Sequence, residues 1–274
     1  MVERLTKDPV ANANPNGYRV VPFPPGQHMA VDWHSVMTRQ HNIHALLEFD
    51  VTETRRAIHL FRRTSGRPLS FTALLVASFA HAIGEDPALQ AYRRGKGHVV
   101  LFDDVDVAVL VEQVINGDRV PVPHLVLAAN RKTPTEVDRE IRAAQTEGDP
   151  YGRARRFLPL WLALPAVIRR FAITRILADP RRRKKYTGTA AVTAVGMFGQ
   201  GTGWGIPFGI HTICLTVGGV GRKPGLGRGG RVEAREVVCL TISVDHDVVN
   251  GAPVARFISR LRESIETAAL LGSD

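Results

Sequence analysis

Residues Thr241–Phe257 read TISVDHDVVNGAPVARF and place a histidine between a strand and a helix. Upstream, the apolar and β-branched run from Val237 to Val244 predicts a strand buried on both faces. Downstream, Pro253 suits the first turn of a helix whose apolar residues recur at helical spacing from Val254 to Ala268. His246 is therefore predicted to lie where a side chain is held rigidly yet stays accessible, which suits a general base.

A lone histidine in a turn is more often an ordinary polar residue, but the residues around this one form a wider pattern. The segment DHDVVNGAPVARF resembles the DH-R-x-x-DG-A signature of the CoA-dependent acyltransferases. This family includes chloramphenicol acetyltransferase and the catalytic domains of the dihydrolipoyl acyltransferases of 2-oxoacid dehydrogenase complexes. The resemblance implies that His246 is the catalytic base. Asp247 stands where the signature has arginine, and Asn250 stands where it has aspartate.

Three further segments resemble the dihydrolipoyl acyltransferase domain in the same order. They are LSFTALLVASFAHAIGEDPALQAYR, RVPVPHLVLAANRKTPTEVDREIRAAQ and GTAAVTAVGMFG. With the histidine segment they cover roughly residues 45 to 268, apart from a basic stretch in the middle. The resemblance implies an α/β fold, the chloramphenicol-acetyltransferase-like two-layer sandwich with a mixed β-sheet and covering helices. It also implies a homotrimer, or a multiple of trimers, with active sites between subunits.

The resemblance also assigns roles to two more residues. Thr193 matches the family serine that stabilises the oxyanion of the tetrahedral intermediate, and a threonine hydroxyl can donate the same hydrogen bond. Without the match, Thr193 reads equally well as one more β-branched strand residue. Asn250 matches an aspartate that is chiefly a structural charge partner, and asparagine there can hydrogen-bond but cannot balance a buried cation. Ala194 replaces an asparagine, which removes one polar contact.

Local signals predict several elements. A strand ends near Val51, Thr52 caps a helix that runs through Arg62, and Ser70 caps a deeply buried helix. Thr133 and Glu136 form a capping box at the start of another helix. The stretch GGVGRKPGLGRGG reads as a hairpin connection, because a strand and not a helix follows it. The irregular mixture of strands and helices predicts a mixed sheet.

Length and composition favour one domain over residues 18–274, preceded by a polar tail over residues 1–17, and the resemblance implies that this domain is the catalytic one. The tail has no room for lipoyl or subunit-binding modules, so we expect no covalent lipoyl group on this chain. The start of the chain carries charges and no apolar core, which predicts a cytoplasmic protein without a signal peptide. Cys214 and Cys239 lie in apolar strand-like runs and are predicted to be reduced, buried thiols.

The formal net charge of +10 is concentrated in one basic, apolar insertion, residues 151–186, which has eleven basic residues against one acidic residue. Basic and acidic residues balance elsewhere, which argues against nucleic acid as a partner. Three interpretations of the insertion stay open. Its apolar part packs on the domain or on a neighbouring subunit, or it lines the acyl-CoA entrance with Arg181, Lys184 and Lys185 near the phosphates, or it lies on an anionic membrane.

Two hypotheses for the function follow. In the first, the protein is an acyltransferase that uses coenzyme A, or acyl-CoA, as a substrate and passes the acyl group to a thiol or small-molecule acceptor. A lipoyl arm on a partner protein is one such thiol, and no metal is needed. His41 and His44 are the only close histidine pair, and no carboxylate or thiolate is spaced around them to make a metal site. In the second, the chain is a structural or regulatory trimer that has lost catalysis.

Overall fold

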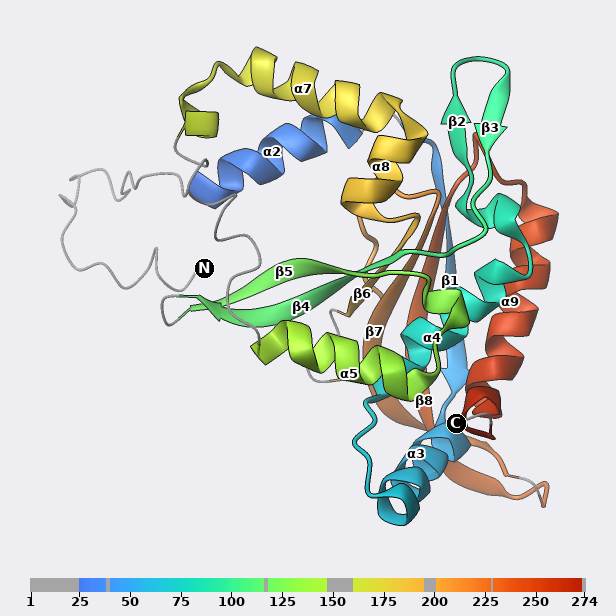
Figure 1. Cartoon of the computed structure of the whole chain (residues 1–274). Helices are drawn as coiled ribbons and strands as arrows, with labels where there is room; N and C mark the ends of the chain where they lie inside the picture. Colours follow the sequence, from blue (N-terminus) through green and yellow to red (C-terminus); the bar gives the residue numbers. More distant parts are fainter. Residues whose placement is uncertain are drawn as a thin grey trace, which may run out of the picture.

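The computed structural model describes residues 25–37, 40–115, 118–146, 160–194, 201–227 and 229–272. In these residues a six-stranded sheet carries helices on one face (Figure 1). The main elements in chain order are α2 (Pro25–Met37), β1 (Asn42–Asp50), α3 (Thr52–Ser65), α4 (Phe71–Gly84), β2 (Tyr92–Arg94), β3 (His98–Val100), β4 (Val107–Ile115), β5 (Asp118–Val126), α5 (Pro134–Thr146), α7 (Ala166–Ala178), α8 (Pro180–Thr187), β6 (Ala190–Ala194), β7 (Ile213–Leu226), β8 (Val232–Asp245) and α9 (Gly251–Glu266).

The large sheet is mixed, as the sequence predicts. Its strand order is β1-β8-β7-β6-β4-β5, and β6 pairs in parallel with both β4 and β7 while the other pairs are antiparallel. The proline-bearing strand β5 lies at an edge, where a missing backbone donor costs least. Strands β2 and β3 form a separate hairpin. Strand β8 lies between β1 and β7, and its last eight residues are all buried.

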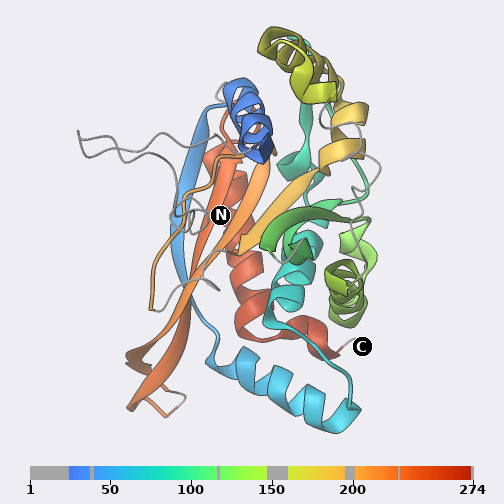
Figure 2. The ribbon, with the colours of Figure 1, turned by 90° about the vertical axis from the view of Figure 1, so that its left-hand side faces the viewer.

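Helices α4, α5 and α9 all lie on one side of this sheet (Figure 2). Helix α4 is buried along nearly its whole length, from Ala73 to Ile83, which accounts for its lack of a polar face. Phe79 of α4 meets Phe257 of α9 edge to face, with 5.9 Å between the ring centroids. The predicted two-layer α/β sandwich is confirmed.

Two of the predicted helix caps are confirmed and one is wrong. The Ser70 hydroxyl accepts the Ala73 N–H at 3.1 Å, and Thr133 and Glu136 exchange hydrogen bonds of 3.3 and 2.8 Å as a capping box. Thr52, however, begins α3 rather than capping it. Its own N–H donates to the Asp50 carboxylate at 2.9 Å, and its hydroxyl accepts the Glu236 N–H at 2.7 Å. The longer carboxylate two residues earlier therefore replaces the expected cap.

The predicted hairpin is confirmed, because β7 and β8 pair antiparallel, but most of the glycine-rich stretch is strand and only its end is the connection. Strand β7 runs to Leu226, and residues 227–231 alone separate it from β8. Residues 201–203 pass directly over β7 at an irregularity in its pairing between Val217 and Val220. The Gly219 N–H donates to the Gly203 carbonyl at 3.0 Å, and a Cβ on Gly219 would overlap the Gly201 carbonyl. The glycines here allow two backbones to touch.

The two cysteines are free and buried, as predicted. Burial raises the pKa of the Cys214 thiol to about 12, which makes it a poor nucleophile. The predicted tail, residues 1–17, lies outside the described residues, and the domain boundary stays a prediction. Within the predicted insertion the structure describes residues 160–186, which contain α7 and most of α8.

Replacing Gly219 by alanine should destabilise the fold by about 1–3 kcal/mol, because the added methyl group has no room against residues 201–203. Denaturant unfolding followed by circular dichroism measures the change. Gly229→Ala is the matched control, since a Cβ there meets nothing within 4 Å. Equal stability of the two variants would contradict the close approach.

Candidate functional site

His246 lies in the turn that directly follows β8 and is exposed to solvent. Its N–H donates to the His41 carbonyl at 2.9 Å, which continues the pairing of β8 with the chain that leads into β1. Five residues later α9 begins. The predicted position between a buried strand and a helix is therefore confirmed, and a general base at this place would be rigidly held and reachable.

Asp245, the last residue of β8, organises the turn that carries His246. Its backbone carbonyl accepts the N–H groups of Val248 and Val249, both at 3.0 Å. Its buried carboxylate accepts the Asp247 N–H at 3.1 Å and the Gln40 side-chain amide at 3.2 Å. Asp245 thus fixes both ends of the turn. The sequence analysis did not identify this role.

Arg183 of α8 brings a positive charge to the same region. Its guanidinium lies 3.8 Å above the ring of Tyr92, whose hydroxyl donates to the Gly188 carbonyl at 2.7 Å. Burial raises the pKa of Asp245, and the charge of Arg183 opposes that rise. Arg183 therefore helps Asp245 to remain ionised. No sequence signal separates the half-buried Arg183 from the exposed Arg181 and Arg182 in the run RRRKK.

Asp247 contacts two basic side chains. Its carboxylate lies 3.1 Å from His41 Nδ1 and 3.5 Å from Arg93. The departure from the arginine of the signature therefore has a local role, because this carboxylate links the turn to the start of β1 and to β2. His44 Nδ1 lies 2.8 Å from the Ser243 hydroxyl. In the part of the chain that the structure describes, no group of three or more histidine, cysteine, aspartate or glutamate residues could hold a metal ion.

Asn250 lies immediately before α9 and is exposed. Its backbone has the extended conformation of a helix-capping residue, but its side chain accepts no hydrogen bond from the first turn. The amide is therefore not occupied in stabilising the helix start. It lies four residues after His246, at the other end of the same turn.

Thr193 lies on β6, far from His246 in the same chain. Ala190 and Val192 are buried in the helix-side core, so Thr193 points to the opposite face of the sheet. It is in register with Thr216 of β7, which is in register with Thr241 of β8. With strands about 4.8 Å apart and about 3.3 Å per residue, Thr193 lies roughly 16 Å from the strand end that carries His246. One chain does not bring the two side chains together.

The three residues considered for contact with the phosphates of acyl-CoA have different surroundings. Lys184 donates to the Asp104 carbonyl at 2.9 Å and lies 3.3 Å from an Asp106 carboxylate oxygen, so it is an anchor of α8. Arg181 and Lys185 are exposed. Arg181 lines a small groove of about 330 Å³ between the β2–β3 hairpin and the corner that joins α7 to α8. These three side chains do not converge on one site.

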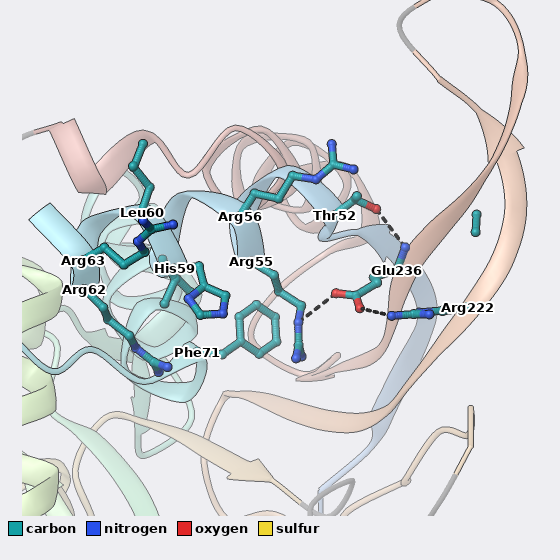
Figure 3. A pocket seen from close by; sticks show the side chains of 12 residues that line it. Thr52, Arg55, Arg56, His59, Leu60, Arg62, Arg63, Phe71, Arg222 and Glu236 are labelled. Atoms are coloured by element: carbon teal, nitrogen blue, oxygen red, sulfur yellow. Dashed lines mark hydrogen bonds and ion pairs between the residues drawn. The ribbon is translucent and has the colours of Figure 1, made fainter.

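A larger groove of about 760 Å³ lies between α3 and the β7–β8 hairpin (Figure 3). Arg55 and Arg222 both contact Glu236 there, at 2.8 and 3.7 Å, beside Phe71. Glu236 precedes Asp245 by nine strand residues, which corresponds to about 30 Å. This groove is therefore at the opposite end of the sheet from His246, and it does not belong to the candidate site.

His211 is buried and directly precedes Thr212, whose carbonyl accepts the Asp245 N–H at 2.8 Å. The Nε2–H of His211 donates to the Thr187 carbonyl at 2.6 Å. The pKa of His211 is lowered to about 4, chiefly by burial; the hydrogen bond to Thr187 opposes this shift and the charge of Arg183 adds to it. His211 is therefore neutral at pH 7 and joins the end of α8 to the segment before β7.

We expect His211 to make the fold sensitive to acid. Because its pKa is about 4 when folded and about 6.5 when unfolded, the stability that it contributes is fully present above pH 6.5 and is lost as the pH falls towards 4. The shift corresponds to a loss of about 3 kcal/mol over that window. His211→Gln keeps a donor for Thr187 and should flatten the dependence of the unfolding free energy on pH, whereas His98→Gln, at an exposed site, should not. If the unfolding free energies of wild type and His211→Gln change with pH in the same way, His211 is not the source of the acid sensitivity.

Residues 181–272 match the family model for the 2-oxoacid dehydrogenases acyltransferase (catalytic domain). The chain is also 24% identical, over 226 residues, to the lipoamide acyltransferase component of the branched-chain alpha-keto acid dehydrogenase complex of Bacillus subtilis (strain 168). That alignment covers 81% of this chain and 46% of the relative. The chain therefore spans about half the length of the curated relative that it matches.

Solved structures show the same fold. A probable dihydrolipoamide acetyltransferase from Listeria monocytogenes superposes with a TM-score of 0.66 at 20% identity, covering 92% of this chain and 95% of the other. The dihydrolipoamide acetyltransferase of Azotobacter vinelandii gives 0.66 at 17% identity, covering 96% and 98%. The predicted resemblance is confirmed: this chain is related in sequence and fold to the acyltransferase catalytic domains of 2-oxoacid dehydrogenase complexes.

Proposed function

We propose that the protein transfers an acyl group between a CoA thioester and a thiol of the dihydrolipoamide type, or a small-molecule acceptor, with His246 as general base. The observation that carries the proposal is the exposed imidazole of His246 on a turn that the buried Asp245 holds at the end of a central strand. The family match over residues 181–272 includes Thr193, His246 and Asn250 and supports it. The acceptor thiol is free or carried on the lipoyl arm of a partner protein.

The transfer needs one base and one oxyanion donor. The imidazole of His246 takes the proton from the acceptor thiol as its sulfur attacks the thioester carbonyl carbon. The carbonyl electrons move to oxygen, and the hydroxyl of Thr193 donates to that oxyanion. When the tetrahedral intermediate collapses, the bond from carbon to the CoA sulfur breaks and the departing thiolate takes the proton from the imidazolium. The acyl group is then on the acceptor and His246 is neutral again.

The oxyanion donor comes from a neighbouring subunit in this proposal. Thr193 lies roughly 16 Å from the strand end that carries His246, beyond the reach of one substrate carbonyl between them. A homotrimer, or a multiple of it, would place His246 of one chain beside Thr193 of the next. In support, one solved relative is described as the cubic core of the pyruvate dehydrogenase multienzyme complex.

The work on the Azotobacter vinelandii enzyme supports the choice of residues. It concerned the role of a serine, a histidine and an asparagine in the catalytic mechanism of that protein. The asparagine follows the histidine by four residues there, as Asn250 follows His246 here. The serine precedes the histidine by 52 residues, and Thr193 precedes His246 by 53. We therefore assign Asn250 a polar role beside the base.

Replacing His246 by alanine should lower the rate of acyl transfer by about a hundredfold or more, because the attacking thiol loses its proton acceptor. Mass spectrometry of dihydrolipoamide and a panel of thiols and amines, incubated with acetyl-CoA and longer acyl-CoAs, measures the product. His59→Gln is the control, since His59 lies on α3 at the far end of the sheet. Unchanged turnover in His246→Ala would refute the role of His246 as general base. Stoichiometric acyl-CoA binding by wild type with no turnover of any acceptor would favour the non-catalytic trimer.

Mixing two inactive variants should restore activity if sites lie between subunits. His246→Ala and Thr193→Ala chains, dissociated and reassembled together at equal amounts, should form about a quarter of interfaces with both side chains intact. The rate should rise towards that fraction of wild type, since each variant alone lacks the base or the oxyanion donor. Light scattering checks that both variants and the mixture have the wild-type mass. A mixture no more active than the variants would show that each chain carries a whole site.

A further inference from the structure

Helix α7 is clamped in a defined orientation at one end of the molecule. Asp32 of α2 is buried, and its carboxylate lies 2.5 Å from Arg169 and 3.1 Å from Arg170. Arg169 also donates to the carbonyls of Leu162 and Leu164, at 3.2 and 2.6 Å. Ile173 is buried on the same side of the helix. The inward side of α7 is therefore fixed, and so is the direction of its outward side.

The outward side of α7 is apolar and exposed. Val167, Ile168 and Phe171 expose 78%, 50% and 66% of their surfaces, and Leu160, in the helical turn before α7, exposes 67%. Val167 and Phe171 are four residues apart and so lie one above the other, with the exposed Arg175 continuing the row. Figure 1 shows α7 as the outermost helix at this end, with α2 beneath it. Four large exposed apolar side chains on one short segment mark an interaction surface.

Positive charge is concentrated at one end of this apolar row. Residues 151–186 contain eleven basic residues and one acidic residue, and the rest of the chain is balanced. Some of these cations are used inside the fold, as Arg169, Arg183 and Lys184 are. Arg175, Arg181, Arg182 and Lys185 are exposed. An apolar row with exposed cations next to it is complementary to the surface of an anionic bilayer, where the headgroups are negative and the layer beneath them is apolar.

We propose that this end of the protein docks on an anionic lipid surface. Its membrane face consists of Leu160, Val167, Ile168, Phe171, Arg175, Arg181, Arg182 and Lys185. The apolar side chains enter the boundary between headgroups and acyl chains, and the basic side chains contact lipid phosphates. The binding is peripheral: no helix in the described part of the chain is long and apolar enough to cross a membrane. This inference does not depend on the proposed function.

Flotation of the full-length protein with vesicles tests the docking. At low salt the protein should float with vesicles in which phosphatidylglycerol replaces part of the phosphatidylcholine. Its affinity for pure phosphatidylcholine vesicles should be weaker by roughly tenfold or more. Added salt should release it, because screening shortens the reach of surface charge. A protein that stays unbound to phosphatidylglycerol vesicles at low salt would overturn the proposal.

Paired variants identify the face that binds. The Val167→Ser/Phe171→Ser double variant should lose flotation by roughly tenfold or more. Leu226→Ser/Val232→Ser is the matched control, because these two side chains are each 73% exposed at the far tip of the β7–β8 hairpin. Light scattering decides between lipid and a second copy of the chain as the occupant. If the α7 variant changes the mass of the assembly, or if both double variants bind vesicles equally, the membrane face is refuted.

Discussion

The candidate site depends on one buried carboxylate, that of Asp245 at the end of β8. A charge at this depth is costly unless it is compensated. The Asp247 N–H, the Gln40 amide and the charge of Arg183 compensate it from three separate parts of the chain. Because the backbone carbonyl of Asp245 also receives two amides of the turn, the position of the imidazole next to it is set by a residue that has no part in the chemistry.

The basic segment is less uniform in the fold than its composition suggests. Arg169 meets a buried carboxylate, Arg183 stacks on an aromatic ring and Lys184 holds a loop carbonyl, so these three cations act as internal braces. The cations that remain exposed cluster around α8 and the end of α7. A count of charge along the sequence therefore overstates the number of basic side chains that a partner could contact. The structure shows which of them are exposed.

Much of the fold could be predicted because the local sequence signals of these elements agree with the way the elements pack. The buried strand before His246, the fully apolar helix α4 and the capping box at Thr133 each carry a signal within a few residues. Predictions failed where the deciding contact is distant in sequence. Strand pairing and the crossing of residues 201–203 decide that the glycine-rich stretch is extended, and the Asp50 carboxylate replaces Thr52 at the helix start. The roles of Arg183 and Asp245 depend on contacts between elements far apart in the chain, which no short window contains.

Because Thr193 and His246 are far apart on one chain, the proposed activity would depend on the association of chains. If each site is completed only where two chains meet, catalysis per chain follows the fraction of chains that have associated. For a trimer at high dilution that fraction grows with the square of the protein concentration. A newly made or dissociated chain would then hold no working site, and it would leave reactive thioesters untouched until it had found its neighbours.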